Sequence, residues 1–363
     1  MPVPAFDYLR GYHARRDEFD AGIRRVLESG RLILGPEVES FESAFASYVG
    51  AKRAVGVASG TDALILALRA LDVGSGDEVV TVANTAVATV AAIRAVGALP
   101  RFIDVRDDTL LMDTSKVEEA IGPRTKCLLP VHLFGWPVDM DALLAVARSH
   151  DLPIVEDCAQ AHGARWNGRH VGTFGAIGCF SFYPTKNLGG FGDGGMCVTG
   201  DDSLADRVRR LRMYGFPDTG DRVALEEGLN SRLDELQAAI LRVRLAHLDE
   251  ALAARRAIAA RYRRGLTNTP HRLPPERPAA RDAQHLFAIR TERREDVCAR
   301  MSAAGIGYGI HYPVPIHVMP AYSLLDMPVG SLPVTERAAN EILSLPMFPE
   351  LRDDEIDAVL STL

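Results

Sequence analysis

Strand-like and helix-like segments alternate between residues 54 and 156, and this alternation constrains the fold more than any other feature of the sequence. Each short apolar run is followed by a stretch with apolar residues at helical spacing. The expected strands are 54–58, 78–82, 101–105, 127–131 and 153–156, and the expected helices are 62–71, 87–95, 115–121 and 140–150. Repeated βα units predict an α/β fold with a mostly parallel sheet and helices on both faces. In such sheets, ligands bind outside the carboxyl ends of the strands.

Asp157 and Lys186 stand where such a sheet would place ligand-binding residues. Asp157 follows the run 153–156, and Lys186 lies between a second apolar run, 177–182, and a glycine-rich stretch. Pyridoxal 5'-phosphate (PLP) needs an imine-forming lysine that is desolvated or close to positive charge. It also needs a buried carboxylate that keeps its ring nitrogen protonated. We therefore assign Lys186 and Asp157 as catalytic candidates, with Gln160 suited to the ring oxygen and Ser181 to the phosphate.

Lysine is rare in this chain, which makes Lys186 more informative. The lysines are Lys52, Lys116, Lys126 and Lys186, so 37 of the 41 basic residues (41 − 4) are arginines. A guanidinium cannot form an imine, so a lysine in an apolar, glycine-rich turn indicates a chemical role. An ordinary lysine in an exposed loop is the alternative that composition and spacing leave open.

The segment Ser59-Gly60-Thr61-Asp62 stands between an expected strand and an expected helix. Its backbone amides and the positive end of the helix would form a phosphate site, and Gly60 would allow a close approach of the backbone. A serine or threonine before a helix is more often only an N-cap. Together with Lys186 and Asp157, the segment predicts the place of the cofactor phosphate.

Four stretches in order resemble the DegT/DnrJ/EryC1/StrS aminotransferases, which are sugar aminotransferases of fold type I. They are SGTDAL at 59–64, EDCAQAHGA at 156–164, SFYPTKNLGGFGDGG at 181–195 and GLNSRLDE at 228–235. The resemblance implies a homodimer with its active site at the subunit interface. It also implies a cofactor site made by Gly60, Thr61, Asp62, Asp157, Gln160, Ser181 and Lys186, with Asn230 supplied by the other subunit.

The same resemblance implies the substrate. It is a nucleotide-linked keto-deoxysugar, with L-glutamate as the amino donor. The segment HYPVPIH at 311–317 matches the part of the family that closes over the sugar, so the substrate-binding candidates are Tyr183, His311, Tyr312 and His317. The stretches at 81–93 and 130–141 are more similar to the 3-aminotransferase branch, which favours a dTDP-3-keto-6-deoxyhexose over a 4-keto sugar or a keto-cyclitol.

One position departs from the family pattern. Relatives usually carry an aromatic residue that stacks on the cofactor ring soon after the second strand, and this chain has Ala86 there. Two rival functions also remain: a PLP-dependent dehydratase on the same scaffold and a non-catalytic regulatory homologue. Lys186 opposes the first, since such dehydratases replace the lysine with histidine, and the intact Lys186, Asp157 and phosphate turn oppose the second.

Composition and charge argue against several other classes of protein. The net charge of −7, without a dense basic run, argues against nucleic acid as the main partner. The longest apolar run, 79–93, is too short and too polar for a membrane span, and the N-terminus has no apolar signal region. The five cysteines are odd in number and lack CxxC spacing, so we expect reduced, packed thiols, no metal site and a cytoplasmic protein.

The domain boundary is expected near residue 245. Residues 1–245 would form the large PLP-binding domain, with residues 1–30 as a helical arm, and residues 246–363 a smaller α+β domain. Ser231 with Asp234 resembles a capping box at the start of a long helix. In the small domain we expect strands at 285–290 and 308–312 and helices at 295–304 and from 353 onward. His132 is expected to be a hydrogen-bonded structural histidine.

Overall fold

The computed structural model describes residues 2–217 and 219–363. Its centre is a mixed sheet built from two hydrogen-bonded parts, β3-β2-β4 and β5-β8-β9-β1. Parallel bridges from Leu128 to Ile154 and from Val131 to Asp157 join the two parts. The strands are β1 Arg53–Val57, β2 Glu78–Val82, β3 Leu99–Ile103, β4 Thr125–Leu128, β5 Val155–Asp157, β8 Ile177–Ser181 and β9 Gly195–Thr199.

Only β9 runs against its neighbours in this sheet, because it pairs antiparallel with both β1 and β8. The pairs β2–β3, β2–β4 and β5–β8 are parallel. The predicted α/β fold with a mostly parallel sheet is therefore confirmed. As expected for this arrangement, Asp157 lies at the carboxyl end of β5, and Ser59 lies just beyond β1.

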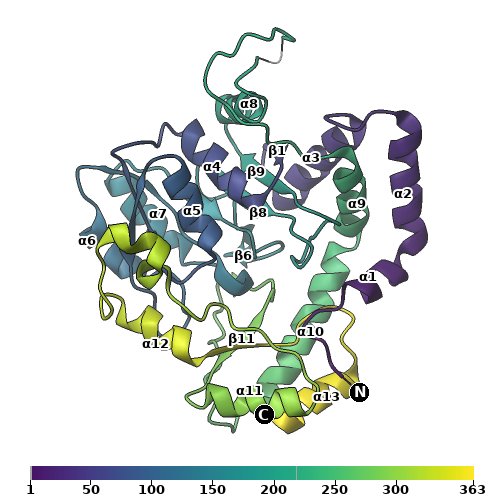
Figure 1. The fold of residues 1–363 in the computed structure, drawn as a ribbon, viewed down its shortest axis with the longest axis vertical. Helices are drawn as coiled ribbons and strands as arrows, with labels where there is room; N and C mark the ends of the chain where they lie inside the picture. The colour runs from purple at the N-terminus through teal and green to yellow at the C-terminus, as the bar shows by residue number, and fades with distance from the viewer. Residues whose placement is uncertain (1, 218) are drawn as a thin grey trace.

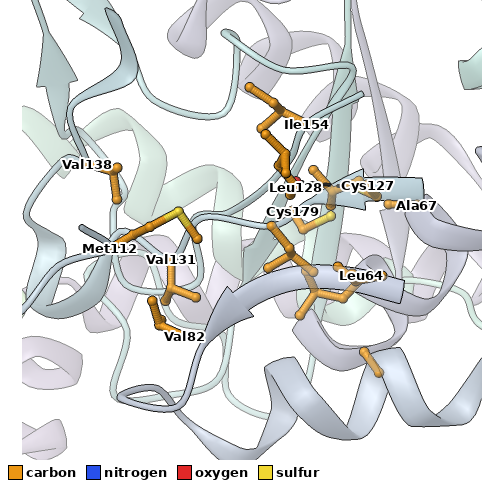
Figure 2. Packing of buried hydrophobic residues seen from close by; sticks show 14 of the residues in the cluster. Leu64, Ala67, Val82, Met112, Cys127, Leu128, Val131, Val138, Ile154 and Cys179 are labelled. Atoms are coloured by element: carbon orange, nitrogen blue, oxygen red, sulfur yellow. Dashed lines mark hydrogen bonds between the residues drawn. The ribbon is translucent and has the colours of Figure 1, made fainter. Parts of the chain in front are cut away.

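Helices cover both faces of the sheet, as Figure 1 shows. They are α3 Pro36–Val49, α4 Gly60–Ala70, α5 Val87–Ala95, α6 Val117–Ala120, α7 Met140–Ser149, α8 Asp202–Leu211 and α9 Glu235–Ala246. Side chains alternate between faces along a strand. In β8, Cys179 packs in the cluster with α4 and α7, whereas Phe180 packs in the cluster with α3 and α9. Figure 2 shows the first cluster, with Leu64 of α4 near Cys179.

The N-terminal arm is helical, as expected, but it consists of two helices. It forms α1 Tyr8–Ala14 and α2 Arg16–Ser29, separated at Arg15, whose φ of −134° is not helical. Gly30 ends α2 in the left-handed conformation, with φ 66°, as a glycine readily does. The helix α2 lies beside α9, although about 200 residues of chain separate the two helices (Figure 1).

The predicted capping box at Ser231 is wrong. Helix α9 begins at Glu235, and the Ser231 hydroxyl instead accepts from the Ala58 N–H at 3.1 Å and donates to Asp62 Oδ2 at 2.7 Å. Ser231 bonds to residues far away in the sequence instead of capping the nearby helix, because it is buried against the loop after β1. Glu235 is likewise used at a distance, since its carboxylate accepts from the N–H groups of Gly35, Glu37 and Val38.

The C-terminal lobe contains α10 Leu248–Leu266, α11 Arg294–Ala303, α12 Pro333–Glu341 and α13 Asp353–Thr362. Its sheet pairs β11 Phe287–Arg290 with β12 Ile342–Leu345. The expected strand at 308–312 is wrong, because only Gly309 bridges, to Ser344, and β12 takes the position beside β11. The short 3-10 helices Ile316–Val318 and Pro320–Leu325 follow, and a small sheet joins β6 Arg165–Trp166, β7 Arg169–His170 and β10 Ala280–Arg281.

Candidate active site

Lys186 lies in a tight turn just beyond β8. Its backbone N–H donates to the Tyr183 carbonyl at 2.8 Å, and the turn passes so close to itself that a Cβ on Gly189 would lie 2.5 Å from the Pro184 carbonyl oxygen. Within the described chain, the Lys186 amine has no hydrogen-bond partner. Burial lowers the pKa of this amine to about 8, although the nearby Asp157 carboxylate opposes the change. At this pKa the charged form still prevails at pH 7, but the neutral, nucleophilic fraction of the amine is far larger than at the ordinary pKa of 10.5.

Asp157 is the buried carboxylate that shares a cavity with Lys186. Thr89 Oγ1 donates to Asp157 Oδ2 at 2.8 Å, and the Ala159 N–H donates to Oδ1 at 3.1 Å. Thr85, one turn earlier, lies 2.8 Å from the Thr89 hydroxyl and so fixes its orientation. Burial raises the pKa of Asp157, and these donors and Lys186 act in the opposite direction. A cationic N–H group placed against Asp157 would therefore be strongly favoured.

The N-terminus of α4 and Ser181 form a close-packed corner of the same cavity. The Ser59 hydroxyl caps α4 by accepting from the Asp62 N–H at 3.0 Å. A Cβ added to Gly60 would lie only 2.5 Å from the Ser181 Cβ, so glycine is needed there for this approach. Gly60, Thr61 and Ser181 all line the cavity, and the positive end of the helix makes this corner suited to an anion.

The cavity has a volume of about 230 Å³. It brings together the predicted residues Gly60, Thr61, Asp157, Gln160, Ser181, Tyr183 and Lys186. Tyr183 is 52% exposed at its mouth. Ala86, noted above, also lines the cavity. Further lining residues were not expected from the sequence: Thr85, Ala88, Val131, Leu133, Ala159 and Asp193. Thr85 and Thr89 could have been recognised as candidates for this site, since they are polar, four residues apart and follow the carboxyl end of β2.

Gln160 joins the cavity to the C-terminal lobe. Its Oε1 accepts from the Phe134 N–H at 2.7 Å, and its Nε2 donates to the Tyr312 hydroxyl at 3.1 Å. One amide hydrogen of Gln160 remains free for another acceptor. Burial raises the pKa of Tyr312 to about 12, so its hydroxyl stays neutral and can donate its own hydrogen.

The remaining predicted residues lie outside the cavity lining. The Asp62 carboxylate accepts from Ser231, and His311 Nδ1 lies 3.0 Å from the Ser344 hydroxyl. His317 is buried, with its Nε2 3.0 Å from Glu336. Asn230 is exposed on the segment that precedes α9.

His132 has the structural role expected from the sequence. Its Nδ1 accepts from the Val138 N–H at 3.0 Å, so its Nε2 carries the hydrogen that is directed to Glu156 at 3.1 Å. Both side chains are buried. Glu156 also accepts from the N–H groups of Gly172, Phe174 and Gly175, and it holds this loop beside β5.

These features fit PLP. The desolvated amine of Lys186, which has no hydrogen-bond partner among the described residues, would supply the attachment point, and the buried carboxylate of Asp157 would pair with a protonated ring nitrogen. The corner at Gly60 and Ser181 offers an anion site at a helix N-terminus. A free N–H of Gln160 remains for a ring substituent. Each group of the cofactor therefore has a matching group in one cavity.

Comparison with known proteins extends this result. Over 362 residues the chain is 50% identical to a dTDP-3-amino-3,4,6-trideoxy-alpha-D-glucose transaminase of Streptomyces venezuelae, covering 98% of this chain and 95% of the relative. The crystal structure of S. venezuelae DesV in complex with a ketimine intermediate is similar with a TM-score of 0.97 and 50% identity, covering 99% and 97% of the two chains.

A third similarity is to NtdA from Bacillus subtilis with bound cofactor PMP. Its TM-score is 0.92 at 31% identity, and it covers 99% of this chain and 84% of that chain. The family described as the DegT/DnrJ/EryC1/StrS aminotransferase family matches residues 13–363. The protein is therefore an aminotransferase, and the chain belongs to the DegT/DnrJ/EryC1/StrS aminotransferase family.

Proposed function

We propose that this enzyme transfers an amino group from L-glutamate to a nucleotide-linked keto-deoxysugar, a dTDP-3-keto-6-deoxyhexose, with PLP as cofactor. The observation that carries the proposal is the desolvated Lys186 amine in one cavity with the buried Asp157. The names of the Streptomyces venezuelae and Bacillus subtilis proteins, and their similarity over nearly the whole chain, support the substrate class and the cofactor.

The residues of the cavity have distinct roles in this proposal. When bound, PLP supplies an electron-withdrawing ring that weakens the C–H bond beside the transferred nitrogen. Lys186 anchors the cofactor and, once released, carries the proton between carbon atoms as general base and acid. Asp157, held by Thr89, keeps the ring nitrogen protonated. Gly60, Thr61 and Ser181 bind the phosphate, and Gln160 donates to the ring oxygen.

The sugar would bind at the mouth of the cavity. Tyr183 is exposed there, and Tyr312 reaches the site through Gln160. His311 and His317 bracket the turn that carries Tyr312, and their bonds to Ser344 and Glu336 indicate that they shape this turn. Ala86 lines the cavity, and its small side chain would leave space beside a bound cofactor ring for the substrate.

The active enzyme in this proposal is a homodimer. Large apolar side chains are exposed beside the turn after α2 and on the segment before α9: Leu27, Leu32, Ile33, Val223 and Leu225. Ile33 bridges to Asp234, so the turn after α2 lies beside the residues that directly precede α9, whereas Val223 and Leu225 lie near Gly215, to whose carbonyl the Leu225 N–H donates. A second copy covering this surface would bury the apolar groups and bring the exposed Asn230 to the other subunit's cofactor phosphate.

A cytoplasmic location is part of the same proposal. All five cysteines are free thiols, as expected in a reducing compartment. No helix among the described residues is long and apolar enough to cross a membrane.

The first experiment records the visible absorption spectrum of the purified protein before and after L-glutamate is added without sugar. We expect a band from lysine-bound cofactor that bleaches with glutamate and is absent in Lys186→Ala. Lys126→Ala, which alters an exposed lysine, is the matched control. Absence of the band after added PLP would contradict the enzyme assignment and favour a regulatory homologue. A panel of 3-keto and 4-keto nucleotide sugars and keto-cyclitols then tests the substrate.

A further inference from the structure

Asn187, the residue after Lys186, is held at both ends of its side-chain amide. Its Nδ2 donates to the Ala283 carbonyl at 2.8 Å, and its Oδ1 lies 3.2 Å from His285 Nδ1. Because a carbonyl only accepts, the amide nitrogen must face Ala283, which leaves Oδ1 as the acceptor for His285. The hydrogen of the imidazole is therefore on Nδ1.

His285 is itself anchored by its backbone. Its N–H donates to the Phe134 carbonyl at 3.0 Å. Its carbonyl accepts from Arg255 Nη1 at 3.2 Å, and the same guanidinium nitrogen serves the carbonyls of Gln284 and Met347. Burial and the nearby Lys186 hold the pKa of His285 well below its usual range, so the imidazole is neutral and places no charge beside the amine.

The chain of contacts continues to the opposite wall of the cavity. Phe134, whose carbonyl accepts from the His285 N–H, donates its own N–H to Gln160 Oε1 at 2.7 Å. Lys186 and Gln160 both line the cavity, yet they come from different loops. His285 connects these two loops through Asn187 on one side and Phe134 on the other. No role in the proposed reaction accounts for this buried, neutral imidazole, whose ring Nδ1 and backbone are both hydrogen-bonded.

We propose that His285 is a positioning residue for Lys186, which holds the lysine turn through Asn187 and ties it to the loop that carries Gln160 through Phe134. The inference deepens the proposed function, since it rests on Lys186 as the reacting amine. Loss of the contact to Asn187 loosens the turn and admits water to the amine. Because burial is what lowers the pKa of Lys186, hydration raises that pKa toward its ordinary value.

The test compares His285→Leu with His285→Asn. Leucine removes the N–H, whereas asparagine keeps an N–H on the atom that corresponds to Nδ1. The pKa of Lys186 is measured in the full-length, cofactor-free protein by competitive acetylation at several pH values and mass spectrometry. The other three lysines serve as internal references. We expect His285→Leu to raise the Lys186 pKa by about one unit and to lower kcat about tenfold or more, as small misplacements do. His285→Asn should restore both.

Two outcomes would overturn the proposal. One is an unchanged Lys186 pKa and kcat in His285→Leu, and the other is the same defect in both variants. If His285→Leu does not fold, Asn187→Ala removes the same contact from its other end, with the exposed Asn340→Ala as matched control. Lys186 behaviour identical to wild type in Asn187→Ala would refute the role. The acetylation measurement uses neither cofactor nor sugar, so an error in the proposed substrate would not affect it.

Discussion

Replacing Lys186 by methionine should stabilise the cofactor-free protein, because the folded chain holds an amine where a charge is disfavoured. The pKa of this amine is about 8 in the folded protein, against an ordinary value of 10.5. At 1.36 kcal/mol per pH unit, this difference of about 2.5 units corresponds to about 3 kcal/mol. Lys186 keeps some exposure to solvent, so screening reduces the expected gain to about 1–3 kcal/mol.

The stabilisation by Lys186→Met should depend on pH, and this dependence identifies the buried charge as its cause. Below pH 8 the amine is charged in both the folded and the unfolded chain, and the full cost of the buried charge is present. Between pH 8 and 10.5 the folded chain releases a proton that the unfolded chain keeps, so the stability of the unmodified protein rises. The advantage of Lys186→Met should therefore be greatest below pH 8 and vanish by pH 10.5.

Denaturant unfolding of the cofactor-free protein, followed by tryptophan fluorescence at pH 7, 9 and 10.5, measures this effect. Lys126→Met, at an exposed position, is the matched control and should show no pH-dependent gain. A constant difference between Lys186→Met and wild type across this range would refute the reasoning, since it would assign the effect to packing. A loss of stability at pH 7 would do so as well.

Three further predictions concern the cofactor site. Thr89→Val removes a donor to the buried Asp157. Because hydrogen bonds to charged groups contribute about 1.5–3 kcal/mol, the affinity for PLP in an absorbance titration should fall about tenfold or more. Thr85→Val, which removes a hydroxyl that does not contact Asp157, should lower the affinity less. An equal effect of both would contradict this assignment. Gly60→Ala places a Cβ 2.5 Å from the Ser181 Cβ and should abolish tight binding of PLP and of phosphate, whereas Gly74→Ala, with its nearest neighbour at 3.8 Å, should not. Tyr312→Phe leaves the Gln160 amide without its acceptor and should lower kcat/KM for the sugar about tenfold. The shape of its pH profile between 6 and 10 should stay unchanged, because the pKa of Tyr312 is about 12, and a lost alkaline limb would disprove this.

Most of the central sheet and the helices that cover it could be predicted from the sequence, because these elements have local causes. The strands β2 and β8 are short, fully buried and mostly apolar, and α4 and α5 carry apolar residues at helical spacing. Lys186, Asp157, Gln160 and Ser181 could be assigned because each stands at the carboxyl end of a strand or a few residues beyond it, where a parallel sheet gathers its ligand-binding groups. The structure places all four around one cavity.

The tertiary structure decided the features that depend on partners far apart in the chain. Ser231 bonds to the loop after β1 rather than capping α9, and the segment 308–312, expected as a strand, contributes only the bridge from Gly309 to Ser344. Thr89 reaches Asp157 across 68 residues, and His285 reaches Asn187 across 98. A pattern along the sequence reports which face of a segment is apolar, but a polar side chain chooses among all the buried groups that the fold brings near it. The sequence by itself therefore determined most of the scaffold and singled out Lys186 as a candidate, and only the packed structure decided which residues contact the Lys186 turn and Asp157, because those contacts exist only when distant segments exclude water together.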